Sequence, residues 1–331
     1  MLVCDGVCRH RMRRRRNRGR LREKPLQVQL AVQRRRRQGG DSVGVHSNSL
    51  TVVARLPGHY RRESPRNPSI GDPAIRNPAI RNPDPDDPTS VHSAALVAIS
   101  HGTNSPDGRA AIATLVEAVA LARPDLYVTG GFVDVQQPDV TASLDKIRAG
   151  CAAVVVPLLL SAGYHVHVDL QRDTRAHSRV TALSPALGPD VRLIDVLERR
   201  LCAAGFDQRV PGQEIVLAAA GSSDVRAVSD CQAVGAQLER RLGVRVTVGF
   251  LSAATPRLAC AITAARLRSR MVTVSTYLMA PGFFFDLAHA QGAHAARITA
   301  PLLMPEETAA TSLVDLVIDR YLTAREHSGL F

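Results

Sequence analysis

The sequence lacks the features of a membrane protein, a secreted protein or a zinc-ribbon protein. Its longest apolar run, Cys151 to Gly163, is too short to cross a bilayer and contains Pro157. The arginine-rich N-terminal part has no apolar core of the length that a secretory signal needs. The six cysteines are scattered, and no two have the two-residue spacing of zinc or iron–sulfur sites. We therefore expect a cytoplasmic protein with no membrane span and with reduced, mostly buried thiols.

Positive charge is concentrated in the first ninety residues. The formal net charge is +12, yet residues 1–90 carry 20 Lys and Arg against 8 Asp and Glu, whereas residues 91–331 carry 22 of each. A basic tail says little about the surface of the domain behind it, and these arginine runs lack interleaved aromatic residues that would stack on bases. We expect no nucleic-acid partner, with an RNA or membrane tether as the alternative role of this segment.

The composition of residues 1–90 predicts a disordered basic and proline-rich extension. Arginines dominate from Arg9 to Arg37, with too few apolar residues between them to bury a core. Four pentads, RNPSI, GDPAI, RNPAI and RNPDP, then follow one another between Arg66 and Pro85. A proline in the third place of each pentad removes backbone donors and favours an extended spacer.

From residue 94 onward, short apolar runs alternate with segments of helical periodicity. This alternation is typical of a parallel sheet with helices on both faces, which binds ligands at the C-terminal ends of its strands. The predicted strands are Ala94–Ser100, Tyr127–Val135 and Ala152–Leu160, and the predicted helices are Arg109–Ala122 and Pro138–Ala149.

The second part of the chain repeats this order at an offset of 118 or 119 residues. Gly221 corresponds to Gly102, and Pro256 corresponds to Pro138. A repeat of this length predicts two similar α/β domains that face one another across a cleft. We place them at residues 91–207 and 208–331 and call them the first half and the second half. Because one chain carries both halves, we expect a monomer.

The repeat points to candidate site residues, because each half serves as a control for the other. Three potential metal ligands follow strands of the first half, and the second half has residues that bind metals poorly in their places. The pairs are His101 and Ala220, Asp134 and Ser252, and His165 and Phe284.

Two imidazoles and a carboxylate suit Fe²⁺, Co²⁺, Ni²⁺ or Zn²⁺, and a site with few protein ligands leaves positions open for exchange. A histidine with a pKa near neutrality can also accept a proton while its partner holds the ion. We therefore expect His101 and His165 to be metal ligands and catalytic residues, with Asp134 as a third catalytic residue or, alternatively, a turn or helix-cap residue.

Other polar residues have an ordinary surface role as the alternative. His165 and His167 are two residues apart, which is the spacing of side chains on one face of a strand, so the sequence allows one of them to be a plain surface residue. His165 is the preferred ligand because it corresponds to Phe284 in the repeat. The remaining candidates are arginines that would meet substrate carboxylates and two further histidines, all of which the sequence also allows as surface residues: Arg109, Arg172, Arg175, His289 and His294.

Three motifs resemble a known family. They are Leu96-Val-Ala-Ile-Ser-His101-Gly-Thr, Gly131-Phe-Val-Asp134-Val-Gln-Gln-Pro138 and Val155-Val-Pro157-Leu-Leu-Leu-Ser-Ala-Gly-Tyr-His165-Val-His-Val-Asp169-Leu. Together they look like the class II sirohydrochlorin chelatases, over about residues 94 to 305. The motifs are less similar to those of the ferrochelatases that make protoheme.

The resemblance implies two flavodoxin-like domains, a tetrapyrrole between them and His101 and His165 as metal ligands. The family commonly has glutamate at the position of Asp134, and aspartate is one methylene shorter. Some longer cobalt-inserting relatives carry a His-rich tract or a cysteine cluster near the C-terminus. Neither follows Met304, which favours siroheme formation.

The leading hypothesis is thus a lyase that inserts Fe²⁺, as substrate, into sirohydrochlorin, with no bound organic cofactor. The alternatives are a cobaltochelatase that acts on the same ring for cobalamin and a metal or tetrapyrrole carrier without turnover.

Overall fold

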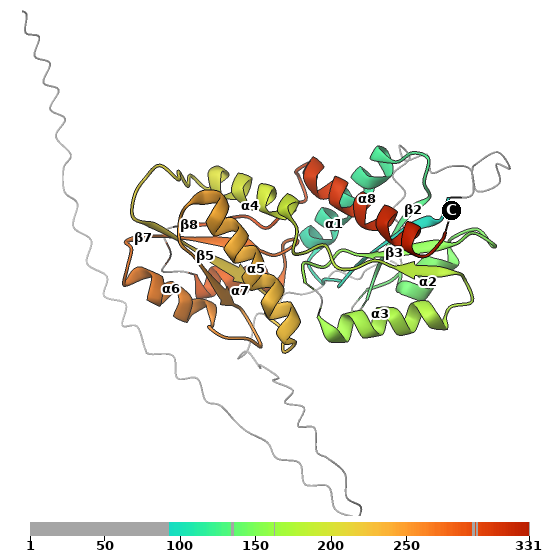
Figure 1. Ribbon diagram of the computed structural model, residues 1–331, viewed down its shortest axis with the longest axis horizontal. Helices are drawn as coiled ribbons and strands as arrows, with labels where there is room; N and C mark the ends of the chain where they lie inside the picture. Colours follow the sequence, from blue (N-terminus) through green and yellow to red (C-terminus); the bar gives the residue numbers. More distant parts are fainter. Residues whose placement is uncertain (1–92, 134–135, 162, 293–294, 296, 331) are drawn as a thin grey trace, which may run out of the picture. The chain divides into compact units, whose positions relative to one another are not determined.

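The computed structural model describes residues 93–133, 136–161, 163–292, 295 and 297–330, which alternate between strands and helices (Figure 1). The predicted extension 1–90 lies outside this part of the chain, as do Asp134 and His294. All described residues belong to one compact unit, residues 68–331. They form two four-stranded parallel sheets, one in each half, so the predicted fold class is confirmed.

The elements follow one another in the same order in the two halves. The first half contains β1 (Ala95–Ser100), α1 (Pro106–Ala122), β2 (Val128–Phe132), α2 (Val140–Asp145), β3 (Ala153–Pro157), α3 (Tyr164–Ala176), β4 (Thr181–Leu183) and α4 (Val191–Ala203). The second half contains β5 (Gln213–Ala219), α5 (Val225–Leu242), β6 (Val246–Phe250), α6 (Leu258–Arg266), β7 (Met271–Tyr277), α7 (Phe283–Gln291), β8 (Arg297–Ile298) and α8 (Thr311–His327).

The strand order is β2-β1-β3-β4 in the first sheet and β6-β5-β7-β8 in the second, and every described pair is parallel. This order begins like that of flavodoxin-like sheets. The predicted bounds of the second strand and helix were too wide. β2 ends at Phe132, and α2 begins only after Asp139, whose carboxylate accepts a hydrogen bond from the Ala142 amide (2.8 Å).

The apolar strands are buried on both faces, as continuous apolar runs predict for a parallel sheet. In β1, Val97 and Ile99 pack on the side of α2, whereas Leu96 and Ala98 belong to a larger apolar cluster on the other face. That cluster continues into the second half through β5 and α5. The two halves therefore share this apolar cluster as one core.

The repeat is visible in details of the backbone. Gly102 and Gly221 both have left-handed φ angles, of 99° and 91°. A Cβ at Gly221 would lie 1.9 Å from the Ser252 carbonyl oxygen, so a side chain is excluded there. The peptide bonds before Pro138 and Pro256 are both cis.

The last helix of each half packs on the sheet of the other half. α4 contacts α5 and β7, which belong to the second half, whereas α8 contacts α1, β3 and β4, which belong to the first. In Figure 1 the red helix α8 lies beside α1 and β3 for this reason. Leu197 of α4 and Leu316 of α8 are fully buried in the cluster that the halves share. Each sheet thus depends on a helix from the other half.

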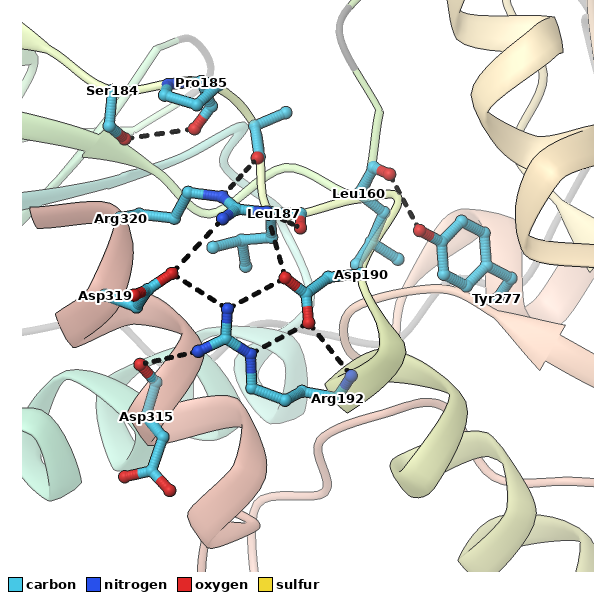
Figure 2. Close-up of polar contacts among 11 residues, drawn as sticks. Leu160, Ser184, Pro185, Leu187, Asp190, Arg192, Tyr277, Asp315, Asp319 and Arg320 are labelled. Atoms are coloured by element: carbon cyan, nitrogen blue, oxygen red, sulfur yellow. Dashed lines mark hydrogen bonds and ion pairs between the residues drawn. The ribbon is translucent and has the colours of Figure 1, made fainter. Parts of the chain in front are cut away.

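Charged side chains join the crossing segments where α4 begins (Figure 2). Asp190 caps α4 and accepts hydrogen bonds from the guanidinium groups of Arg192 (2.8 Å) and of Arg320 in α8 (3.2 Å). Arg192 also pairs with Asp319 (2.9 Å). Burial raises the pKa of Asp190, but the hydrogen bonds from Arg192 and the two positive charges outweigh burial and lower it overall.

Candidate functional site

The first sheet brings the segments that carry the candidate residues to one edge. β1 lies between β2 and β3 and pairs with both in parallel, with Ser100 opposite Phe132 and Ile99 opposite Pro157. The chain therefore leaves all three strands at the same C-terminal edge, where parallel sheets bind ligands. His101 is the first residue after β1, and its side chain is exposed.

Two hydrogen bonds hold the loop on the C-terminal side of His101. The Thr103 amide donates a hydrogen bond to Oε1 of Gln136, which belongs to the segment after β2 (2.8 Å). The Ser105 hydroxyl then caps α1 by accepting a hydrogen bond from the Gly108 amide (3.2 Å). These bonds fix the backbone on the C-terminal side of His101 and leave its imidazole open to solvent.

His165 is the second residue of α3, which begins after the loop that follows β3. The strand-like spacing of His165 and His167 was misleading, because the backbone there is helical and positions two apart in a helix do not share a face. Their side chains and residue Asp134 lie outside the described part of the molecule. The structure thus assigns His101 and His165 to segments that leave the same sheet edge, and the metal-ligand assignment stays a prediction.

The second half has the same edge without the candidate ligands. Ala220 follows β5, and Phe284 is the second residue of α7. The amide and the hydroxyl of Ser252 both donate hydrogen bonds to the Ala220 carbonyl oxygen, each at 2.9 Å. In the second half, the segment after β6 is therefore held against the segment after β5.

The two halves touch beside this edge. The Tyr277 hydroxyl, at the end of β7, donates a hydrogen bond to the Leu160 carbonyl oxygen in the loop between β3 and α3 (2.8 Å; Figure 2). Burial raises the pKa of Tyr277 well above its ordinary value. Burial also raises the pKa of the nearby Cys231 thiol to about 11, although a hydrogen bond with Ser161 acts in the opposite direction. Both groups are therefore protonated at neutral pH.

The other sequence candidates lie on the surface. Arg109, Arg172 and Arg175 are exposed, and Arg172 pairs with its neighbour Asp173 (3.2 Å). His289 is exposed and packs edge-on against the Phe285 ring, with centroids 4.6 Å apart.

Sequence reasoning missed Gln136, Tyr277 and Cys231. Gln136 stands two residues after Asp134, and the signal that could have found it is its replacement by Ala254 in the repeat. Tyr277 ends an apolar strand, so the sequence predicts an ordinary core residue. No local sequence pattern indicates that its hydroxyl bonds to a carbonyl 117 residues away.

Among the described residues, no group of three or more His, Cys, Asp and Glu side chains could hold a metal ion. A closed structural metal site is therefore not present within these residues. No helix within the described ranges is long and apolar enough to span a bilayer.

A hollow of about 480 Å³ lies elsewhere, between α5 and the edge strand β6. Its lining includes Gly235, Glu239 and Val248, and it contains none of the candidate residues. We assign it no part in the site.

Comparison with protein families gives one match in each half. The CbiX family matches residues 95–204 and again residues 214–323. No curated protein matches the chain in sequence.

Several solved structures share the fold at low sequence identity. SirB from Bacillus subtilis with Fe³⁺ has a TM-score of 0.59 and 19% identity, over 72% of this chain and 98% of its own. The sirohydrochlorin chelatase SirB from Bacillus subtilis subspecies spizizenii, in complex with cobalt, has a TM-score of 0.55 and 15% identity over the same shares. CbiX, the terminal enzyme of siroheme biosynthesis in denitrifying bacteria, has a TM-score of 0.51 and 18% identity, over 70% of this chain and 99% of its own.

Proposed function

The chain belongs to the CbiX family of sirohydrochlorin chelatases, and on that premise we propose that it inserts Fe²⁺ into sirohydrochlorin to give siroheme and two protons. One observation carries the proposal. The first half has exposed His101 directly after β1 and has His165 in the first turn of α3, whereas the same two positions of the second half hold Ala220 and Phe284. The ligand chemistry is thus confined to one of two otherwise similar sheet edges.

In this proposal His101 and His165 bind the incoming ion, because imidazole nitrogen is a good ligand for Fe²⁺ and Co²⁺. Two protein ligands leave the other coordination positions of the ion free, so the ring nitrogens can replace water there. Since the loop after His101 is fixed by Gln136 and by the Ser105 cap, the imidazole is positioned before the substrate arrives.

Metal insertion also requires two pyrrole N–H protons to leave the ring. A histidine that has released its metal ion, or the Asp134 carboxylate, would accept a proton. Asp134 follows β2, whose C-terminal end lies beside that of β1, and this position in the chain supports the role of a proton acceptor near His101.

Insertion of Co²⁺ is the second candidate, since a chelatase of this fold is described in complex with cobalt. Fe²⁺ and Co²⁺ accept the same ligands, so the ligand set does not separate them. A metal or tetrapyrrole carrier would use the same site without turnover. The proposal further includes a cytoplasmic location and action as a monomer, because one chain carries both halves.

The test is an anaerobic ultraviolet–visible assay of the full chain with sirohydrochlorin and Fe²⁺ or Co²⁺ in turn. We expect the spectrum of the metal-free ring to disappear at catalytic enzyme concentrations. The metal that is inserted faster then identifies the reaction as iron or cobalt insertion. His101→Ala and His165→Ala should each lower the rate at least about 100-fold. Wild-type protein that does no better than buffer with both metals would exclude a chelatase, and stoichiometric binding without turnover would indicate a carrier.

A further inference from the structure

The loop between β3 and α3, which leads to His165, is held at two successive carbonyl groups. The Leu159 carbonyl accepts a hydrogen bond from the Leu187 amide of the first half (2.8 Å). The Leu160 carbonyl accepts one from the Tyr277 hydroxyl of the second half (2.8 Å; Figure 2). Leu160 stands five residues before His165. The second of these two bonds therefore comes from the second half.

The surroundings of the Tyr277 bond are tightly packed. The Tyr277 side chain is 2% exposed. A Cβ at Gly188 would lie 2.3 Å from both the Tyr277 hydroxyl oxygen and the Leu160 carbonyl oxygen, so the backbone of the crossover to α4 closes over the bond. Removal of a buried donor leaves its acceptor unsatisfied, which costs more than loss of an exposed bond.

A second contact involves the next residue of the loop. Ser161 lies beside the Cys231 thiol of α5, in the second half, and partly offsets the rise that burial causes in the pKa of that thiol. Two consecutive residues of the loop, Leu160 and Ser161, thus contact the half that lacks the candidate ligands.

The repeat shows that this Tyr277 contact is one-sided. Leu158 stands in the first half where Tyr277 stands in the second, and a leucine side chain has no hydrogen-bond donor. In the corresponding loop of the second half, the Leu278 and Met279 carbonyls accept hydrogen bonds from the Leu302 and Leu303 amides (both 2.9 Å). Those two bonds stay within the second half.

We propose that Tyr277 is a positioning residue for the metal site, because its hydroxyl fixes the loop that presents His165. The inference rests on the proposed function, in which His165 binds the ion. In this inference the second half holds a metal ligand of the first half, His165, in place. Groups that orient a ligand commonly affect metal affinity about 10- to 100-fold.

The test compares two Tyr→Phe variants of the full chain. Tyr277→Phe removes the bond to Leu160. Tyr321→Phe is the matched control. The buried Tyr321 hydroxyl of α8 likewise donates a hydrogen bond to a backbone carbonyl of the first half, that of Ala94. Ala94 lies at the N-terminal end of β1, whereas His101 follows the C-terminal end. Affinity for Co²⁺ is measured by titration of the visible absorption of the bound ion, with His165→Ala as the reference for a lost ligand.

We expect Tyr277→Phe to raise the Kd for Co²⁺ about tenfold or more, with no such change in Tyr321→Phe. An equal change in both variants, a change below about twofold in Tyr277→Phe, or a wild type that does not bind Co²⁺ would overturn the inference. If Tyr277→Phe does not fold, Gly188→Ala decides, because its Cβ would push the Tyr277 hydroxyl away from the Leu160 carbonyl. A Kd raised about threefold supports the inference, and an unchanged Kd refutes it.

Turnover separates this inference from the proposed function. A wild type that binds Co²⁺ but inserts neither metal would refute the chelatase, while the ratio of the Kd values still decides the role of Tyr277.

Discussion

The two halves of the molecule have the same sheet order, the same positive-φ glycine after the first strand and the same cis-proline before the second helix. They differ at the strand ends, where the first half has His101 and His165 and the second half has Ala220 and Phe284. The scaffold is therefore kept where the candidate ligands differ. The exchange of α4 and α8 also shows that the halves do not act as separate bodies, because each supplies a helix to the other.

Division of the chain tests that exchange and should have the largest effect. We expect residues 91–207 and 208–331, expressed separately, to fail to fold, because each sheet then lacks the helix that covers it. Together the two fragments should recover the fold. Circular dichroism and thermal unfolding measure the outcome, and cooperative unfolding of either fragment alone would show that the boundary at residue 207 separates two independent domains.

The next largest effect concerns the strand ends. His101→Ala and His165→Ala should each lower the insertion rate at least about 100-fold. Ala220→Ser and Phe284→Ala, at the corresponding positions of the second half, should leave the rate within about threefold of wild type. Initial rates with sirohydrochlorin and Fe²⁺ measure both sets. Equal losses in the two halves would mean that the second half also carries catalytic groups.

The charge network at the start of α4 should contribute less than the histidines. Asp190→Asn should lower the free energy of unfolding by about 1.5–3 kcal/mol at neutral pH, because hydrogen bonds to charged groups have this size. Asp207→Asn is the control, since Asp207 pairs with Arg209 in the same local pattern (3.0 Å) but on the surface, where such pairs contribute little.

The effect of Asp190 also depends on pH. Because the pKa of Asp190 in the folded state is below the ordinary value of 3.8, its carboxylate adds stability that is fully present above that pH and is lost as the pH falls through the folded-state pKa. The difference between wild type and Asp190→Asn in urea unfolding should therefore shrink in acid. A difference that stays constant down to about pH 2 would contradict this role.

The smallest expected effect is that of Gln136, which holds the loop after His101 and has Ala254 as its counterpart. Gln136→Ala removes one hydrogen bond, of about 0.5–1.5 kcal/mol, and should lower the insertion rate about three- to tenfold. Gln137→Ala, next in the chain and exposed, should leave the rate unchanged. Equal rates in the two variants would show that the loop needs no such anchor.

Much of the fold was predictable from the sequence because the signals are local. Apolar runs marked β1 and β3, and the repeat predicted that the second half has the same order of strands. The repeat also pointed to His101 and His165, since their replacement by Ala220 and Phe284 can be read without a structure.

By itself, then, the sequence determined the parallel α/β architecture, the doubling and the family. The tertiary structure decided which sheet each last helix covers, because that choice depends on packing between the halves and not on the local sequence pattern of α4 or α8. It also decided the bond from Tyr277 to Leu160 and the helical setting of His165, since a hydroxyl can find a carbonyl 117 residues away only after the chain has folded. Local patterns determine the elements, whereas long-range packing determines which of them meet.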